Sequence, residues 1–215
     1  MNDKIKYPRT PHLPYSPNRT DDDKTLDTDE QFKGMTVVVT EKMDGENTTI
    51  YPDGTLHARS LDGTNHPWQD WVKGDIQNWC YFIPGGWRVC GENLQAKHSI
   101  GYEFPSKHNA FQCFGIYNER NECIAYPDVI DFCQEHDIEM PFIIYCGTYN
   151  KEQILSMFKK YCDFIKRDVE GFVVRNINSF PYSEFDKNVA KYVRSNHIQT
   201  DEHWTRNWTN NKIVK

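Results

Sequence analysis

The sequence predicts an α+β domain built from antiparallel sheets with helices packed around them. Three observations support this prediction. First, the strand signals are short and rich in β-branched residues. Second, Gly, Pro and Asp residues separate these signals. Third, the helical segments do not alternate regularly with the strands. A chain of 215 residues is long enough for one domain with its own core. We expect the folded body over residues 35–195, an extended and partly ordered N-terminal segment over 1–34, and a C-terminal extension over 196–215 packed on the same domain.

The N-terminal segment is rich in Pro and charged residues and has little helical or strand periodicity. This composition is typical of a mobile tail. However, Tyr7, Leu13 and Tyr15 are aromatic or apolar enough to pack against a folded body. We therefore expect part of the segment to wrap around the domain.

Strand signals dominate the first part of the body. The β-branched run VVV predicts a strand over 36–40, and two more are predicted over 47–51 and 55–60. The sequence PDG at 52–54 is typical of a hairpin turn between the last two.

Helices and strands are mixed in the rest of the chain. Apolar residues at helical spacing predict helices over 66–80, 128–136 and 150–166. Apolar runs rich in β-branched and aromatic residues predict strands over 87–92, 110–117, 169–175 and 189–194. The polar, Trp-bearing C-terminal extension is expected to form a helix laid on the body.

Composition excludes several classes of protein. A formal net charge of −6 argues against a protein held on nucleic acid by bulk attraction, and leaves room only for a local basic groove. The seven cysteines form no C-x-x-C pair, which argues against a disulfide framework or a zinc ribbon and favours reduced core thiols. No apolar run approaches the ~20 residues of a membrane span, and the N-terminus lacks a signal-peptide core. We expect a cytoplasmic protein of a bacterium or a phage-infected cell, with no membrane partner.

Lys42 is distinguished by its position between a predicted strand and the turn that begins at Asp44. A lysine amine is a poor nucleophile at its free pKa of about 10.4. In a pocket beside other cations it can lose its proton and attack a phosphorus or carbonyl centre. A K-x-D-G turn taken alone is more often a solvated hairpin.

Six segments in a fixed order make the pattern specific. They are EKMDGEN with Lys42, HARS with Arg59, RVCGENL with Glu92, FQCFGIY with Phe114, DVEGFVVR with Glu170, and VAKYVR with Lys191. Together they resemble the covalent nucleotidyltransferase superfamily of DNA ligases, RNA ligases and mRNA capping enzymes, and most closely its phage-type nick-sealing RNA ligases. The resemblance covers roughly residues 35–195. It implies a nucleotidyltransferase (ATP-grasp-like) fold with an ATP pocket between two antiparallel sheets.

The resemblance implies that Lys42 attacks the α-phosphorus of ATP, releases pyrophosphate and holds AMP as a phosphoramidate. The backbone of Glu41 would help to read the adenine, and the planar fork of Arg59 suits a phosphate oxyanion. Nucleotide binding is implied for Glu41, Asp44, Asn47, Arg59, Glu92, Phe114 and Lys191. Phe114 would stack on the purine, although a plain core position fits it equally well.

Glu170 and Glu92 are the implied ligands of Mg²⁺ (or Mn²⁺). Glu170 precedes a buried G-F-V-V run, where a carboxylate is costly unless it is paired or binds a metal. Gly91 would let a ribose hydroxyl or a metal approach Glu92 closely, although a solvated strand-end carboxylate is the alternative. The metal would neutralise phosphate charge and lower the lysine pKa.

Lys191 is the second implied catalytic lysine and would bind the α-phosphate. Nick-sealing RNA ligases often carry two lysines here, two residues apart, and this chain has one at that spacing. The source of the second positive charge is therefore open. Candidate RNA contacts are Arg194, His197, Lys166 and Arg167. A solvated helix face is the alternative for the last two.

The expected function is ATP-dependent RNA ligation. It comprises lysine adenylylation, AMP transfer to an RNA 5′-phosphate, and attack by a 3′-hydroxyl that forms a phosphodiester. RNA with these two ends is the expected partner, with accessory RNA-repair proteins as further candidates. About 20 residues follow Arg194, too few for a five-stranded OB domain, so none is expected here. The alternatives are a capping-type guanylyltransferase and a non-catalytic RNA-binding protein of the same fold.

Overall fold

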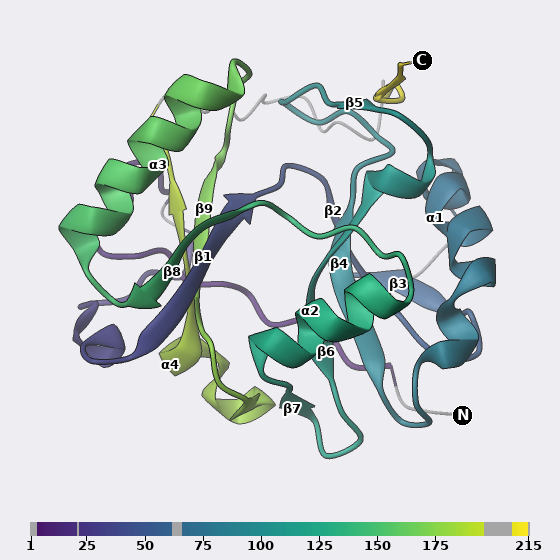
Figure 1. Ribbon diagram of the computed structural model, residues 1–215, viewed down its shortest axis with the longest axis horizontal. Helices are drawn as coiled ribbons and strands as arrows, with labels where there is room; N and C mark the ends of the chain where they lie inside the picture. The colour runs from purple at the N-terminus through teal and green to yellow at the C-terminus, as the bar shows by residue number, and fades with distance from the viewer. Residues whose placement is uncertain (1–3, 21, 62–65, 196–207, 215) are drawn as a thin grey trace.

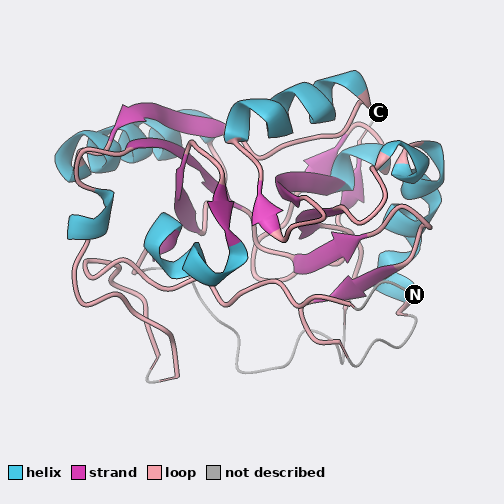
Figure 2. Cartoon of the chain, turned by 90° about the horizontal axis from the view of Figure 1, so that it is seen from below, coloured by secondary structure: helices cyan, strands magenta, loops and turns pink. Residues whose placement is uncertain are grey.

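The computed structural model describes residues 4–20, 22–61, 66–195 and 208–214 (Figure 1). Its main strands form two antiparallel sheets, and helices lie on their outer sides (Figures 1 and 2). This arrangement confirms the α+β prediction. No helix among the described residues is both long and apolar enough to cross a membrane.

The strands fall into a four-stranded and a six-stranded sheet. The four-stranded sheet has the order β11-β9-β1-β8 and consists of β1 (Thr36–Lys42), β8 (Ile143–Thr148), β9 (Gly171–Asn176) and β11 (Val189–Val193). The six-stranded sheet has the order β10-β7-β6-β4-β2-β3 and consists of β2 (Glu46–Ile50), β3 (Leu56–Ala58), β4 (Arg88–Asn93), β6 (Phe111–Tyr117), β7 (Glu122–Cys123) and β10 (Phe180–Pro181). A separate parallel pair joins β5 (Glu103–Phe104) to β12 (Lys212–Ile213).

The helices are α1 (Asp70–Asp75), α2 (Tyr126–Glu135), α3 (Lys151–Ile165) and α4 (Phe185–Asn188). Short 3₁₀ turns cover Glu30–Phe32, Pro67–Gln69, Ile76–Asn78, Cys80–Phe82, His108–Ala110 and Tyr182–Glu184. Helix α3 begins where the Asn150 side chain accepts a hydrogen bond from the backbone N–H of Gln153 (2.8 Å), and it ends at Lys166, which has a φ of 52°.

One sequence prediction of structure is wrong, and another is tested only over 208–214. The predicted helix over 66–80 is broken into one short α-helix and 3₁₀ turns, because the side chain of Gln95 binds the Pro67 carbonyl (3.1 Å) and the Trp71 N–H (2.8 Å). The described part of the C-terminal extension, 208–214, contains strand β12 and no helix. Strand β8 was not predicted.

The chain passes from one sheet to the other directly after Lys42, the last residue of β1. Residues 43–45 make the crossing, and β2 begins at Glu46 in the six-stranded sheet (Figure 1). Gly45 is required in this turn, because a Cβ there would lie 2.5 Å from the Asn93 carbonyl oxygen. The lysine is therefore held at the junction of the two sheets.

The N-terminal segment spans the same junction. Its Ile5 N–H donates to the hydroxyl of Tyr51, next to β2 (2.9 Å), and its residues Pro11 and Leu13 bond to the backbone of Lys191 in β11 (2.8 Å each). Leu13 is fully buried with the core of the four-stranded sheet.

Each sheet has its own core. Helix α3 packs Ile154 and Phe158 against Phe172 of β9, while the six-stranded sheet packs Trp79 and Ile116 with other apolar side chains. The seven cysteines are all free and five are buried, as reduced core thiols would be.

Candidate active site

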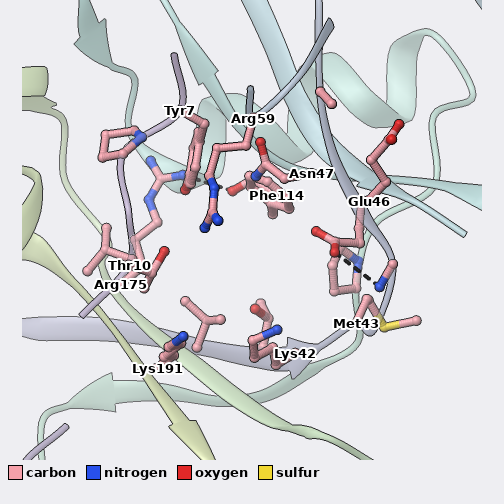
Figure 3. A pocket seen from close by; sticks show the side chains of 18 of the residues that line it. Tyr7, Thr10, Lys42, Met43, Glu46, Asn47, Arg59, Phe114, Arg175 and Lys191 are labelled. Carbon is pink, nitrogen blue, oxygen red and sulfur yellow. Dashed lines mark hydrogen bonds between the residues drawn. The ribbon is translucent and has the colours of Figure 1, made fainter. Parts of the chain in front are cut away.

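A cavity of about 760 Å³ lies beside Lys42 and draws its walls from both sheets and from the N-terminal segment (Figure 3). The charged residues of its wall whose side chains are not turned to the far face of the sheet are Lys6, Lys42, Glu46, Arg59, Glu92, Arg175 and Lys191. Lys42 and Lys191 lie on one side of the cavity, and Arg59 lies across from them (Figure 3). The cavity is large enough to hold a nucleoside triphosphate.

The amine of Lys42 is paired with a carboxylate. Its Nζ lies 2.7 Å from Oε2 of Glu170, and the two side chains are 22% and 9% exposed. Burial alone would lower the pKa of Lys42, but the carboxylates of Glu170 and Glu92 outweigh it and raise the pKa. Lys42 therefore keeps its proton here, and Lys191 is a neighbouring cation in the same cavity.

Glu92 completes the acidic side of the site. It lies on β4 and its Oε1 accepts a hydrogen bond from the backbone N–H of Gly45 (3.1 Å). Burial raises the pKa of Glu92 to about 8, Lys42 opposes the shift, and Glu170 adds to it. Two buried carboxylates thus share the positive charge of a single ammonium.

The pKa of Lys191 is shifted in the opposite direction to that of Lys42. Burial and then the positive charge of Lys42 lower its pKa, with a further contribution from Arg59. Asp23 of the N-terminal segment opposes this shift, since its Oδ1 lies 3.6 Å from the Lys191 Nζ. The sequence pattern left open which residue supplies a second positive charge near Lys191. Arg59 and Arg175 line the same cavity and are positively charged.

Aromatic side chains form the apolar part of the cavity. Phe114 lies on β6 and faces Tyr7 of the N-terminal segment, with ring centroids 5.1 Å apart in an edge-to-face arrangement. Tyr126 and Val173 also line the cavity. Phe114 is therefore a wall residue available to a base, and not only a core residue.

Some predicted nucleotide-binding residues have side chains engaged elsewhere. The carboxylate of Glu41 is buried against Arg167 and Tyr161, and Asp44 accepts from the Ile100 N–H (2.8 Å). Asn47 does line the cavity, and its Oδ1 is buried without a hydrogen-bond partner among the described residues. Such an orphaned acceptor is consistent with a ligand that donates to it.

Of the predicted RNA contacts, Lys166, Arg167 and Arg194 do not line the cavity. Arg194 pairs with Asp168 (2.5 Å), and Arg167 pairs with Glu41 (2.6 Å). Lys166 ends helix α3, and His197 lies outside the described residues. RNA binding by these side chains stays a prediction.

Sequence reasoning missed several wall residues. Lys6, Tyr7, Pro8 and Thr10 belong to the N-terminal segment, and the wall also includes Glu46, His66, Trp68 and Arg175. Arg175 is the last residue of the DVEGFVVR segment, and it donates from Nη1 to the Phe114 carbonyl (3.2 Å). In the sequence, the one signal for Arg175 was a charged residue at the end of an apolar strand segment.

A comparison with known families identifies the family to which this chain belongs. The family described as RNA ligase matches residues 35–193. The chain belongs to the RNA ligase family. The match contains Lys42, Arg59, Glu92, Phe114, Glu170 and Lys191, so most of the cavity wall of this RNA ligase family member lies in the matched region, and the N-terminal segment adds the rest. A comparison with curated proteins gives no match.

Solved structures share the fold. An archaeal ATP-dependent RNA ligase is 16% identical, with a TM-score of 0.61 over 91% of this chain and 51% of its own. A putative ATP-dependent DNA ligase from Aquifex aeolicus is 16% identical, with a TM-score of 0.58 over 88% and 50%. A Naegleria gruberi RNA ligase variant with ATP and Mn is 18% identical, with a TM-score of 0.54 over 77% and 52%. The chain spans about half the length of these relatives.

The site fits a divalent cation that is completed by substrate. No cluster of three or more His, Cys, Asp or Glu among the described residues forms a metal cage. Mg²⁺, however, is usually held by one or two carboxylates plus substrate phosphates. Glu92 and Glu170 supply such a pair, because both lie beside Lys42 at the cavity.

Proposed function

We propose that this protein is an ATP-dependent RNA ligase that works through a covalent lysyl-AMP. The observation that carries the proposal is the position of Lys42. It lies at the sheet junction, paired with Glu170 at 2.7 Å and beside a cavity of about 760 Å³ that also contains Lys191 and Arg59. A nucleophile, an acidic pair and phosphate-binding cations thus surround one nucleotide-sized space.

In the first step the Lys42 Nζ gives up a proton and attacks the α-phosphorus of ATP. An N–P bond forms, and the α-phosphorus–oxygen bond to pyrophosphate breaks with the electron pair going to the leaving group. Lys191 and Arg59 would bind the phosphate oxygens, because both lie on the cavity wall and carry positive charge. Phe114 offers its ring to the adenine.

Glu92 and Glu170 would hold Mg²⁺. The ion would supply charge neutralisation, both of the phosphates and of the carboxylates that raise the pKa of Lys42. The chain's own contribution is to bring Glu92 of β4, in the six-stranded sheet, and Glu170, just before β9 of the four-stranded sheet, together beside the lysine.

In the following steps the AMP moves to an RNA 5′-phosphate, and a 3′-hydroxyl then attacks that phosphorus and displaces AMP. The chemistry is displacement at phosphorus, so positioning and charge neutralisation carry the catalysis. RNA with a 5′-phosphate and a 3′-hydroxyl is the proposed substrate.

The experiment is label transfer followed by sealing. The protein is incubated with Mg²⁺ and either α-labelled ATP or α-labelled GTP, and then given nicked RNA duplexes. We expect label on the protein from ATP alone and a sealed RNA strand. Label from GTP would instead favour a guanylyltransferase, and no label from either nucleotide would contradict the proposal.

A further inference from the structure

Side chains on the face of β1 away from the cavity hold the residue before Lys42. Glu41 and Lys42 are consecutive strand residues, so their side chains point to opposite faces of the sheet. The Glu41 side chain is 2% exposed, which makes an uncompensated charge there very costly. The compensation comes from a distant part of the sequence.

Arg167 and Tyr161 satisfy this carboxylate completely. Arg167 donates from Nη1 to Oε1 (2.6 Å) and from Nη2 to Oε2 (2.7 Å), which is the bidentate fork that guanidinium groups form with carboxylates. The Tyr161 hydroxyl of α3 donates to Oε2 (2.5 Å). Three charge-assisted hydrogen bonds therefore fix the end of β1.

The same arginine is linked to the turn after Lys42. Its guanidinium carbon lies 5.1 Å from the centre of the Tyr102 ring, a cation–π distance. The Tyr102 hydroxyl in turn accepts a hydrogen bond from the backbone N–H of Asp44 (2.9 Å). Side chains in contact with one another thus hold the residue before Lys42 and the second residue after it.

The segment that carries Arg167 also carries the partner of the lysine. Residues 167–170 join α3 to β9, with Arg167 bound to Glu41 at one end and Glu170 bound to Lys42 at the other. Gly171 follows, and a Cβ there would lie 1.8 Å from the Tyr192 carbonyl oxygen. The close packing of β9 against β11 leaves this segment little freedom to shift.

We propose that Arg167, Tyr161 and Tyr102 are positioning residues for Lys42, acting through Glu41 and the Asp44 backbone to hold its amine in line with the bond to be broken. None of the three lines the cavity wall, so they act without touching the nucleotide. The inference rests on the proposed function, because it concerns the attack by Lys42 on ATP. A nucleophile misplaced by about 1 Å loses on the order of 100-fold in rate, which sets the scale of the effect.

The test compares Arg167→Lys, which keeps the charge but loses the fork, with Tyr161→Phe, which loses one hydrogen bond and keeps the ring. Matched controls are Arg120→Lys, whose exposed side chain pairs with Glu122, and Tyr145→Phe, whose hydroxyl bonds the Thr148 carbonyl. The rate of label transfer from ATP is measured across ATP concentration. The sealing of a pre-adenylylated RNA strand, which needs no attack by Lys42, is measured separately.

We expect Arg167→Lys to lower kcat for label transfer about 10-fold to 100-fold and Tyr161→Phe about 3-fold to 10-fold. KM for ATP should stay within about 2-fold in both variants, the sealing of pre-adenylylated RNA should stay within about 2-fold in Tyr161→Phe, and both controls should match the wild type. In a Glu41→Gln background, Arg167→Lys should cost little more, because the two side chains act as one unit.

Equal losses in label transfer and in sealing would indicate a general structural defect and overturn the inference, as would wild-type kcat in both variants. If Arg167→Lys does not fold, Tyr161→Phe decides by the same criteria. Absence of label on the wild-type protein would overturn the proposed function, and the inference with it.

Discussion

Lys42 and Lys191 face one cavity from strands on either side of β9, yet their surroundings differ in sign. Carboxylates surround Lys42, and they raise its pKa despite its burial. The pKa of Lys191 is lowered, first by burial and then by the positive charge of Lys42, while Asp23 and Glu170 oppose the shift. The pKa values of two lysines on one cavity are thus shifted in opposite directions.

The difference separates two tasks. A cation among cations gains most from a phosphate that brings negative charge, so Lys191 is suited to bind the nucleotide. A lysine among carboxylates is fixed in place but keeps its proton, so Lys42 requires charge compensation of Glu92 and Glu170 before it attacks. Under the proposed function, the acidic pair would both position Lys42 and restrain it until the substrate complex forms.

The largest expected effects come from replacing each of the two lysines by alanine, one at a time. Lys42→Ala should abolish label transfer from ATP, because it removes the amine that forms the N–P bond in the proposed mechanism. Lys191→Ala should only slow it, by about 10-fold to 100-fold, which corresponds to one charged hydrogen bond. Labelling time courses for both variants measure this, with Lys33→Ala, an exposed lysine paired with Glu30, as the control. Equal loss in both variants would show that the two lysines do not differ in task.

A smaller effect is expected at the acidic pair. Glu170→Gln keeps an acceptor near Lys42 but removes the negative charge that would hold Mg²⁺. We expect label transfer to fall on the order of 100-fold and half-maximal rate to require more Mg²⁺, with the folded state retained. Metal titrations of the labelling rate and a thermal melt measure these. Glu122→Gln, at a surface pair with Arg120, is the control. An unchanged Mg²⁺ requirement would remove Glu170 from the metal site.

Sequence alone was sufficient to place Lys42, the proposed nucleophile, at a strand end, because local signals and the order of the motifs along the chain both point to it. A β-branched run followed by K-x-D-G places Lys42 at a strand end, and the structure has β1 end at that residue. Strand-borne residues such as Glu92 and Phe114 then gather around it as the motif order implied. The antiparallel sheets were likewise predictable from short strands and turns.

The rest depends on contacts between distant residues, which no local pattern encodes. Arg167 and Glu41 are 126 residues apart, and their pairing follows from how α3 ends. The helix predicted over 66–80 fails because side chains such as Gln95 take its backbone groups. Tyr7 has no periodic neighbours, so only the path of the N-terminal segment places it in the cavity wall.

The smallest expected effect concerns how the N-terminal segment holds Lys191. His12 is 2% exposed, its Nδ1 lies 2.9 Å from the Ser16 Oγ, and its Nε2 lies 3.5 Å from Asp23. Burial and then the positive charge of Lys191 lower the pKa of His12 to about 4, while Asp23 opposes the shift. The folded state therefore holds this imidazole neutral, beside the strand that carries Lys191.

The sign of the pH effect follows from this lowered pKa. An unfolded histidine titrates near pH 6.5, so its stabilising contribution is complete above that pH and is lost as the pH falls from about 6.5 toward 4. At pH 5 the loss is at most about 2 kcal/mol in the free energy of unfolding. Denaturant unfolding at pH 7 and pH 5 measures it, with His12→Gln as the variant that cannot titrate. His12→Gln should lose less stability between these pH values than the wild type does, because the other titrating groups are common to both proteins. Equal losses would mean that His12 is not held neutral, and the basic surroundings assigned to Lys191 would then lack one of their supports.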